Sequence, residues 1–155
     1  MKTSVMLESY WADIERLVRD GALRPALRLS AAMPDICAAL EDAQMKSSFE
    51  RYVAWCKAWL RIRAGVSAKA EPGERLYRLY DGQTAAALRR MRMSRRARRE
   101  RSLGRPRVGH PVNRLQAFQI ELVEALVDAG RRWYREQGAQ NALVQRNLGR
   151  LLVSG

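Results

Sequence analysis

The chain has 155 residues, 47% of them hydrophobic, so it is long enough to bury a core as one domain and too apolar to be a disordered chain. It carries 29 Lys and Arg against 16 Asp and Glu, and the net charge of +13 favours nucleic acid, an anionic membrane surface or an acidic protein as partner. No signal peptide is visible and no apolar run is long enough to span a membrane, so we expect a cytoplasmic protein, in bacteria or in a host cell if the gene is phage-borne.

Helical spacing of apolar residues dominates the first part of the chain. It predicts three amphipathic helices, over residues 4–20, 23–40 and 47–60. Pro34 falls inside the second pattern and should kink that helix, or split it in two, around Ala32 and Met33. Ser47 or Ser48 is a suitable N-cap for the third helix.

The remaining chain contains one long irregular stretch and further helical segments. The periodicity fails from Arg63 to Arg75, where Gly and Pro residues predict a loop, and a short apolar segment follows at 76–80. Three more helices are expected, over residues 84–101, 113–137 and 140–153. No segment shows useful strand alternation, so the expected fold is all-α: a compact bundle of about five to six helices, in a single domain spanning residues 1–155.

The arginines are concentrated in one stretch, residues 89–107. Its ten arginines, less Glu100, account for +9 of the net +13. Like charges this dense repel one another along a helix, and an anionic partner relieves that repulsion. The candidate residues for binding nucleic acid or an acidic protein surface are Arg89, Arg90, Arg92, Arg95, Arg96, Arg98, Arg99, Arg101, Arg105 and Arg107. The alternatives are a solvated basic segment without a dedicated ligand, and an arginine excess that reflects a GC-rich genome.

Few other residues suggest catalytic chemistry. His110 is the single histidine, and Arg105 precedes it with the spacing, four residues between Arg and His, of a known ribonuclease motif. Chance matches to this spacing are common in an Arg-rich chain, and a plain loop histidine is the default interpretation. Asp35 directly follows Pro34 and is interpreted as a favourable charge at a helix N-terminus, rather than as half of an acid–base pair with Glu41.

The cysteines and tryptophans are expected to serve the core. Cys37 and Cys56 lie in apolar helical contexts, two thiols do not make a disulfide framework, and no Cys/His spacing fits a zinc site. No metal or other cofactor is therefore expected. Core packing is also the expected role of the tryptophans, with base stacking as the alternative: Trp11, Trp55, Trp59 and Trp133.

Four segments together carry a family resemblance: residues 22–41, 51–55, 122–134 and 141–148. They resemble a family of uncharacterised bacterial helical proteins with HEPN-like features, in which a helix after the middle loop holds a Leu-Arg-x4-His motif, the hallmark of HEPN ribonucleases. Leu88 and Arg89 match the start of that motif, but Ser94 stands where the histidine belongs. The resemblance thus implies an RNA-related scaffold with a degenerate catalytic site, and it allows a homodimer because such domains often pair.

These observations favour a non-catalytic protein that binds nucleic acid, RNA rather than DNA, in a bacterial defence, toxin–antitoxin or mobile-element system. One alternative is a phage- or element-encoded inhibitor that binds a host nuclease complex through the same basic segment. Another is a HEPN-type, metal-independent ribonuclease that uses Arg89 or Arg105 with His110.

Overall fold

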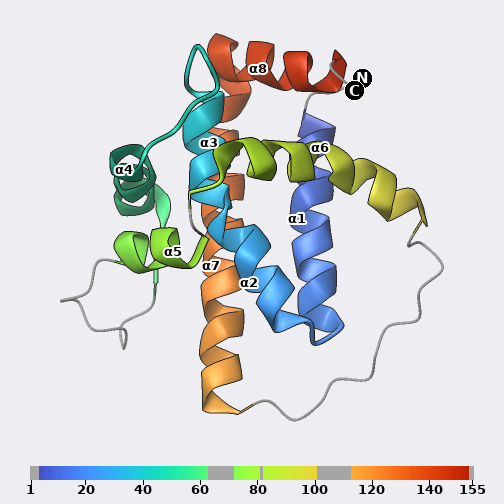
Figure 1. Cartoon of the computed structure of the whole chain (residues 1–155), viewed down its shortest axis with the longest axis vertical. Coiled ribbons are helices and arrows are strands. Elements are labelled where there is room, and N and C mark those ends of the chain that lie inside the picture. The colour runs from blue at the N-terminus through green and yellow to red at the C-terminus, as the bar shows by residue number, and fades with distance from the viewer. Residues whose placement is uncertain (1–3, 63–71, 81, 101–112, 154–155) are drawn as a thin grey trace.

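Every described secondary-structure element is helical, which confirms the all-α prediction (Figure 1). The computed structural model describes residues 4–62, 72–80, 82–100 and 113–153, with the backbone alone at residues 72 and 94–100. The elements are α1 (Ser4–Arg19), α2 (Leu23–Ala31), α3 (Met33–Leu40), α4 (Phe49–Trp59), α5 (Pro72–Tyr80), α6 (Thr84–Glu100), α7 (Arg114–Glu136), the short 3-10 helix η1 (Gly138–Gln140) and α8 (Ala142–Val153).

Helix α3 lies at the centre of the bundle, and all eight of its residues are buried. Helices α2, α4, α6, α7 and α8 pack against it, while α6 also crosses in front of α1 (Figure 1). The bulkiest fully buried side chains around α3 are aromatic and come from three other helices: Tyr10, Trp11, Tyr52 and Trp133. The core therefore draws on both ends of the chain.

Local sequence signals account for most helix ends. The Ser48 side chain accepts a hydrogen bond from the Arg51 backbone N–H at 3.2 Å, so Ser48 is the N-cap of α4. Asn113 and Gln116 form a reciprocal capping box at the start of α7. Pro34 stands in the first turn of α3, where its missing N–H has no intrahelical partner to lose, and the preceding helix ends at Ala31. The predicted split around Ala32 is confirmed.

The expected count of five to six helices is too low, because the described residues contain eight α-helices. One of the additional helices comes from the predicted split of segment 23–40. The predicted loop is also wrong at its end: residues 72–75 are helical and belong to α5, while residues 63–71 lie outside the described part of the chain. A proline at the first helical position fits the geometry of a helix start, which explains why Pro72 opens a helix instead of interrupting one.

Candidate nucleic-acid interface

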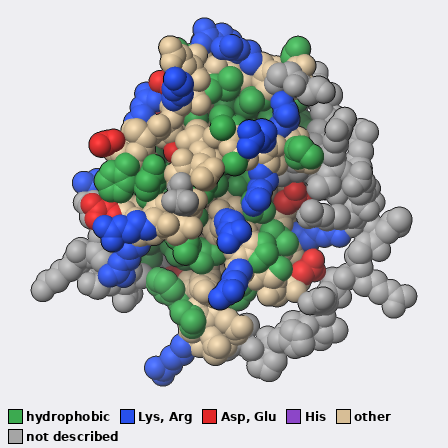
Figure 2. Space-filling model, in the orientation of Figure 1, with side chains coloured by type: hydrophobic (Ala, Val, Ile, Leu, Met, Phe, Trp, Pro, Cys, Tyr) green, Lys and Arg blue, Asp and Glu red, His purple; other side chains and the backbone are tan. Residues whose placement is uncertain are grey.

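Arginine side chains gather over α2 and α6, on the face shown in Figure 2. Arg24 and Arg28 are exposed on α2, and Arg89 and Arg90 are exposed on α6. Residues four positions apart share one side of a helix, so the two α2 arginines point in the same general direction. We call these four residues the α2–α6 basic surface. Arg24, Arg28 and Arg89 form no ion pair or hydrogen bond with any other described residue.

Only part of the predicted basic segment falls within the described structure. Arg89 and Arg90 are exposed, Arg92 is half-buried, and all three lie on α6. The backbone stays helical through residues 95–99, so the arginines there continue along the same helix. The remaining candidates lie outside the described residues: Arg101, Arg105, Arg107 and His110.

A pocket of about 330 Å³ opens within the α2–α6 basic surface. Four helices contribute to its walls, α1, α2, α5 and α6, from both the first and the middle third of the chain. Its lining residues are Tyr10, Arg28, Leu29, Ala32, Leu79, Tyr80, Gln83, Ala86, Ala87 and Arg90. We call it the α2–α6 pocket. Ala86 and Ala87 on α6 are too small to fill this space, and Arg28 and Arg90 make it cationic.

The turn between α5 and α6 sets one wall of this pocket. Gly82 has a backbone φ of 61°, in the left-handed region that favours glycine. A Cβ atom at this position would overlap the hydroxyl group of Tyr77. Glycine therefore permits the tight turn between α5 and α6, and this turn brings Tyr80 at the end of α5 and Gln83 just before α6 to the same pocket.

A buried carboxylate ties three helices together behind the pocket. Asp35 is 1% exposed, and its Oδ2 accepts hydrogen bonds from the Tyr80 hydroxyl, at 2.9 Å, and from the Thr84 hydroxyl. Its Oδ1 has no partner among the described residues. Asp35 does stand in the first turn of α3, as its position after a proline indicates. Sequence reasoning missed its second role, which is to link α3 to the end of α5 and the start of α6.

Burial keeps the tyrosine hydroxyls near the pocket in their neutral, donating form. Desolvation, with the nearby Asp35 charge as a smaller cause, raises the pKa of Tyr80 well above its ordinary value. Desolvation also raises the pKa of Tyr10, whose hydroxyl donates to the Leu29 carbonyl at 2.5 Å. Both phenols are thus fixed hydrogen-bond donors to protein groups and are poor candidates for acid–base catalysis near neutral pH.

The thiols and tryptophans have the structural roles expected of them. Cys37 and Cys56 are free and buried, and burial raises the pKa of both thiols, that of Cys56 to about 12. Trp11, Trp55 and Trp133 are at most 5% exposed. These three rings pack in the core and offer no face to a base, which confirms core packing over stacking for them.

A second groove, between α1 and α7, has a different chemistry. It encloses about 520 Å³ and is lined by three carboxylates and two arginines: Glu15, Glu124, Asp128, Arg19 and Arg131. Arg131 is already paired with Glu15 at 2.5 Å and lies over the Trp11 ring. The carboxylates disfavour an anionic ligand, so this larger groove is not the better candidate for phosphate.

Within the described residues, no group of three or more His, Cys, Asp or Glu side chains is arranged to hold a metal ion. None of the described helices has both the length and the apolar content that a membrane crossing requires. Comparison with protein-family models, with curated proteins and with solved structures finds no match to this chain.

Proposed function

We propose that this protein binds nucleic acid, RNA in preference to DNA, through the α2–α6 basic surface and the arginines that follow on α6, without cleaving it. The observation that carries the proposal is the convergence of arginines from two helices, about sixty positions apart in the chain, around one cationic pocket: Arg28 from α2 and Arg90 from α6. Guanidinium groups match the geometry of phosphate oxygens and form two parallel hydrogen bonds to them.

The distribution of charge along the helices supports this proposal. Helices α2 and α6 together hold nine arginines and one carboxylate, Glu100. Because neutralised phosphates release counterions, each arginine that contacts the backbone of a nucleic acid adds to affinity. A helix this rich in one sign of charge gains most from a partner that carries a regular array of the opposite charge.

The preference for RNA and the absence of cleavage rest on the resemblance to HEPN-like proteins. Arg89 is exposed on α6, at the arginine position of the Leu-Arg-x4-His motif. Ser94 occupies the histidine position and has no imidazole with which to transfer a proton. We therefore place the protein among the binding components of a bacterial defence, toxin–antitoxin or mobile-element system.

Charge reversal on α6 tests the proposal. The variant with Arg95→Glu, Arg96→Glu, Arg98→Glu and Arg99→Glu should bind a labelled single-stranded RNA at least about 100-fold more weakly than the wild type. The slope of log K against log salt should become flatter by roughly three, since each lost phosphate contact removes about 0.7 on a single strand. Fluorescence anisotropy at several salt concentrations measures both.

The matched control reverses four exposed arginines on other elements: Arg61, Arg114, Arg135 and Arg150. It has the same net charge as the α6 variant and should retain most of the affinity and the slope. Unchanged RNA and DNA binding in the α6 variant contradicts the proposal. The remaining candidate partner of the α6 arginines is then an acidic protein surface. RNA cleavage that disappears on His110→Ala contradicts its non-catalytic part.

A further inference from the structure

The α2–α6 pocket has the two kinds of wall that a nucleotide requires. Part of its lining is apolar and includes Leu29, Ala32 and Leu79, and part is polar and includes Arg28, Gln83 and Arg90. A base has flat apolar faces and a polar edge, and it is joined to an anionic phosphate. The volume of about 330 Å³ is at the lower end of the range typical for small-molecule sites.

The polar groups of the pocket divide into those already satisfied and those still available. The hydroxyls of Tyr10 and Tyr80 donate to Leu29 and Asp35, so neither hydroxyl is available to a ligand. The side chains of Arg28 and Gln83, by contrast, form no hydrogen bond with any described residue. A ligand in the pocket would therefore meet both apolar surface and available donors.

Leu79 supplies independent support for an apolar ligand group. It is 55% exposed, although it is a large hydrophobic residue at the edge of a cationic pocket. A purely ionic site for phosphate gains nothing from an exposed leucine beside it. A base that covers Leu79 removes apolar surface from water while its phosphate faces Arg28.

We infer that the α2–α6 pocket binds one unstacked nucleotide of a single-stranded nucleic acid, with the base against Leu29 and Leu79 and the phosphate at Arg28. A base inside a duplex is paired and stacked and must leave the helix before it can enter such a pocket, whereas a base of a single strand is already accessible. The protein therefore selects single strands over duplexes. This inference rests on the proposed function and specifies the form of its ligand.

A pocket-filling variant tests the inference without changing any charge. Ala86 lines the pocket and Ala85 is exposed on the adjacent position of the same helix, so Ala86→Leu and Ala85→Leu form a matched pair. Ala86→Leu should bind a single-stranded RNA 12-mer about tenfold more weakly, which corresponds to the loss of about 1.4 kcal/mol of contact with one base, and bind the duplex of the same sequence unchanged. Ala85→Leu should match the wild type on both.

Competition identifies which part of the nucleotide the pocket holds. Adenosine monophosphate should displace the labelled single strand from the wild-type protein, and should displace it less well from Arg28→Gln. Arg28→Gln also replaces Ala86→Leu as the test variant if Ala86→Leu lowers the melting temperature. Adenosine or inorganic phosphate alone should compete more weakly than the monophosphate. Displacement of a bound monophosphate by the 12-mer would show that the strand and the free nucleotide share the pocket.

The inference and the proposed function fail in different ways. If reversal of the α6 arginines abolishes RNA binding while Ala86→Leu binds the single strand as the wild type does, the protein binds RNA and the pocket does not hold a nucleotide. Equal loss on the single strand and the duplex in Ala86→Leu also overturns the inference. If α6 charge reversal has no effect on RNA binding, the proposed function itself is wrong.

Discussion

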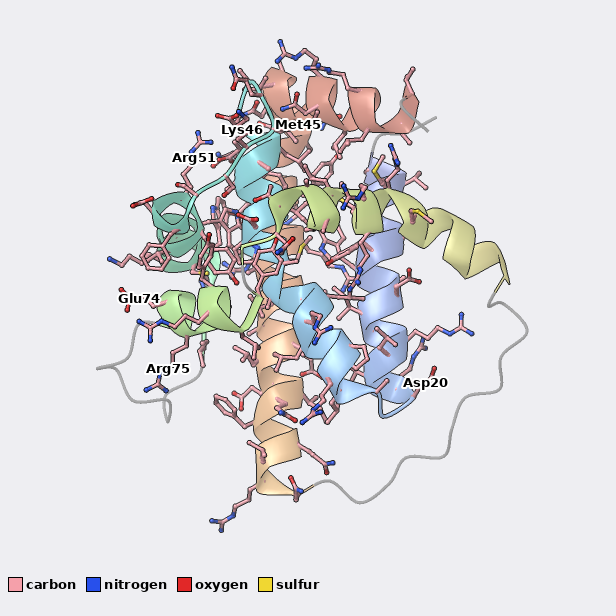
Figure 3. The ribbon with its side chains drawn as sticks, viewed as in Figure 1. Asp20, Met45, Lys46, Arg51, Glu74 and Arg75 are labelled. Atoms are coloured by element: carbon pink, nitrogen blue, oxygen red, sulfur yellow. The ribbon has the colours of Figure 1, made fainter. Side chains whose placement is uncertain are left out.

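Asp42 organises the loop that connects α3 to α4. Its Oδ2 accepts hydrogen bonds from the backbone N–H groups of Gln44 and Lys46, both at 3.0 Å, and its Oδ1 pairs with Arg51 at 2.9 Å. Arg51 also donates to the Lys46 carbonyl, and Figure 3 shows Arg51 beside this loop. The backbone donors are the main cause that lowers the pKa of Asp42, and the Arg51 side chain adds to it.

The lowered pKa of Asp42 predicts a pH-dependent loss of stability. In the folded state the pKa of the Asp42 carboxyl is lower than its ordinary value of 3.8. The ionised carboxylate therefore stabilises the fold fully above pH 3.8, and this stabilisation disappears as the pH falls through the folded-state pKa. Asp42→Asn, which mimics the protonated group, should be less stable than the wild type at neutral pH. Urea unfolding at neutral pH and at a pH of roughly 2 should show the two curves converging in acid. Glu136→Gln removes an exposed carboxylate with no described partner and should show no such convergence.

A buried amide on the last helix bonds to the end of the central helix. Asn147 on α8 is fully buried, and its Nδ2 donates to the carbonyls of Leu40, at 2.9 Å, and Asp42, at 2.8 Å. Carbonyls at a helix C-terminus have no partner within the helix, so a side chain from elsewhere must satisfy them. Asn147 therefore completes the end of α3 and fixes α8 against it.

Removal of this amide should destabilise the fold. Asn147→Ala leaves the buried Leu40 carbonyl without its side-chain donor and takes one of two donors from the Asp42 carbonyl, which still accepts from the Met45 N–H. We expect a loss of about 1–3 kcal/mol in the free energy of unfolding. Urea denaturation followed by circular dichroism measures the loss. Arg150→Ala changes an exposed residue of the same helix and should stay within about 0.5 kcal/mol of the wild type. Equal stabilities of Asn147→Ala and the wild type would show that α8 is held by apolar packing alone.

Helices are the elements that the sequence predicts best here, and their ends follow caps and prolines. Apolar spacing and Ser48 placed α4 correctly, and Pro34 placed the break between α2 and α3. The start of α5 was missed because Gly and Pro residues around position 72 indicate a loop when they are considered without their neighbours. In the structure, α5 is held by α4 and α2 and by aromatic contacts such as Phe49 with Tyr77, and no local pattern reports those contacts.

The sequence predicts only part of the candidate site, because the other residues come together through tertiary packing. A dense run of arginines is a local feature, and it pointed directly to Arg89 and Arg90. Arg28 and Gln83 are isolated in the sequence and become part of the site only because the fold brings α2 and the start of α6 to the same pocket. The Asp35 interaction with Tyr80 spans 45 positions, so position in the chain cannot reveal it.

Charge is segregated across the molecule as a whole. Helices α1 and α7 carry seven of the 16 carboxylates, whereas α2 and α6 carry one. Helices α1 and α7 balance their carboxylates with six arginines, whereas α2 and α6 hold nine arginines, so the excess positive charge lies on α2 and α6 and attracts an approaching polyanion before contact. The same concentration of arginines repels itself when no partner is bound.

That self-repulsion predicts that salt stabilises the unbound protein. Between low salt and 0.5 M NaCl we expect the melting temperature to rise by about 2–4 °C, the shift that about 1 kcal/mol produces in a domain of this size. The α6 charge-reversal variant, whose net charge falls from +13 to +5, should respond less. Thermal denaturation followed by circular dichroism measures both. An identical response of the two proteins would show that the α6 arginines do not repel one another appreciably in the folded state.

The complete burial of α3 also determines how the molecule assembles. A helix without an exposed face cannot dock last onto a finished bundle, so α4, α6 and α8 must close over it. Its contacts with α8 join residues more than 100 positions apart, as the bond from Asn147 to Leu40 illustrates, and such distant closure is slow because the chain loses entropy before it gains contacts. The protein should therefore fold in one cooperative step, more slowly than a bundle of locally paired helices, and a nascent chain that lacks α8 leaves the end of α3 open to solvent.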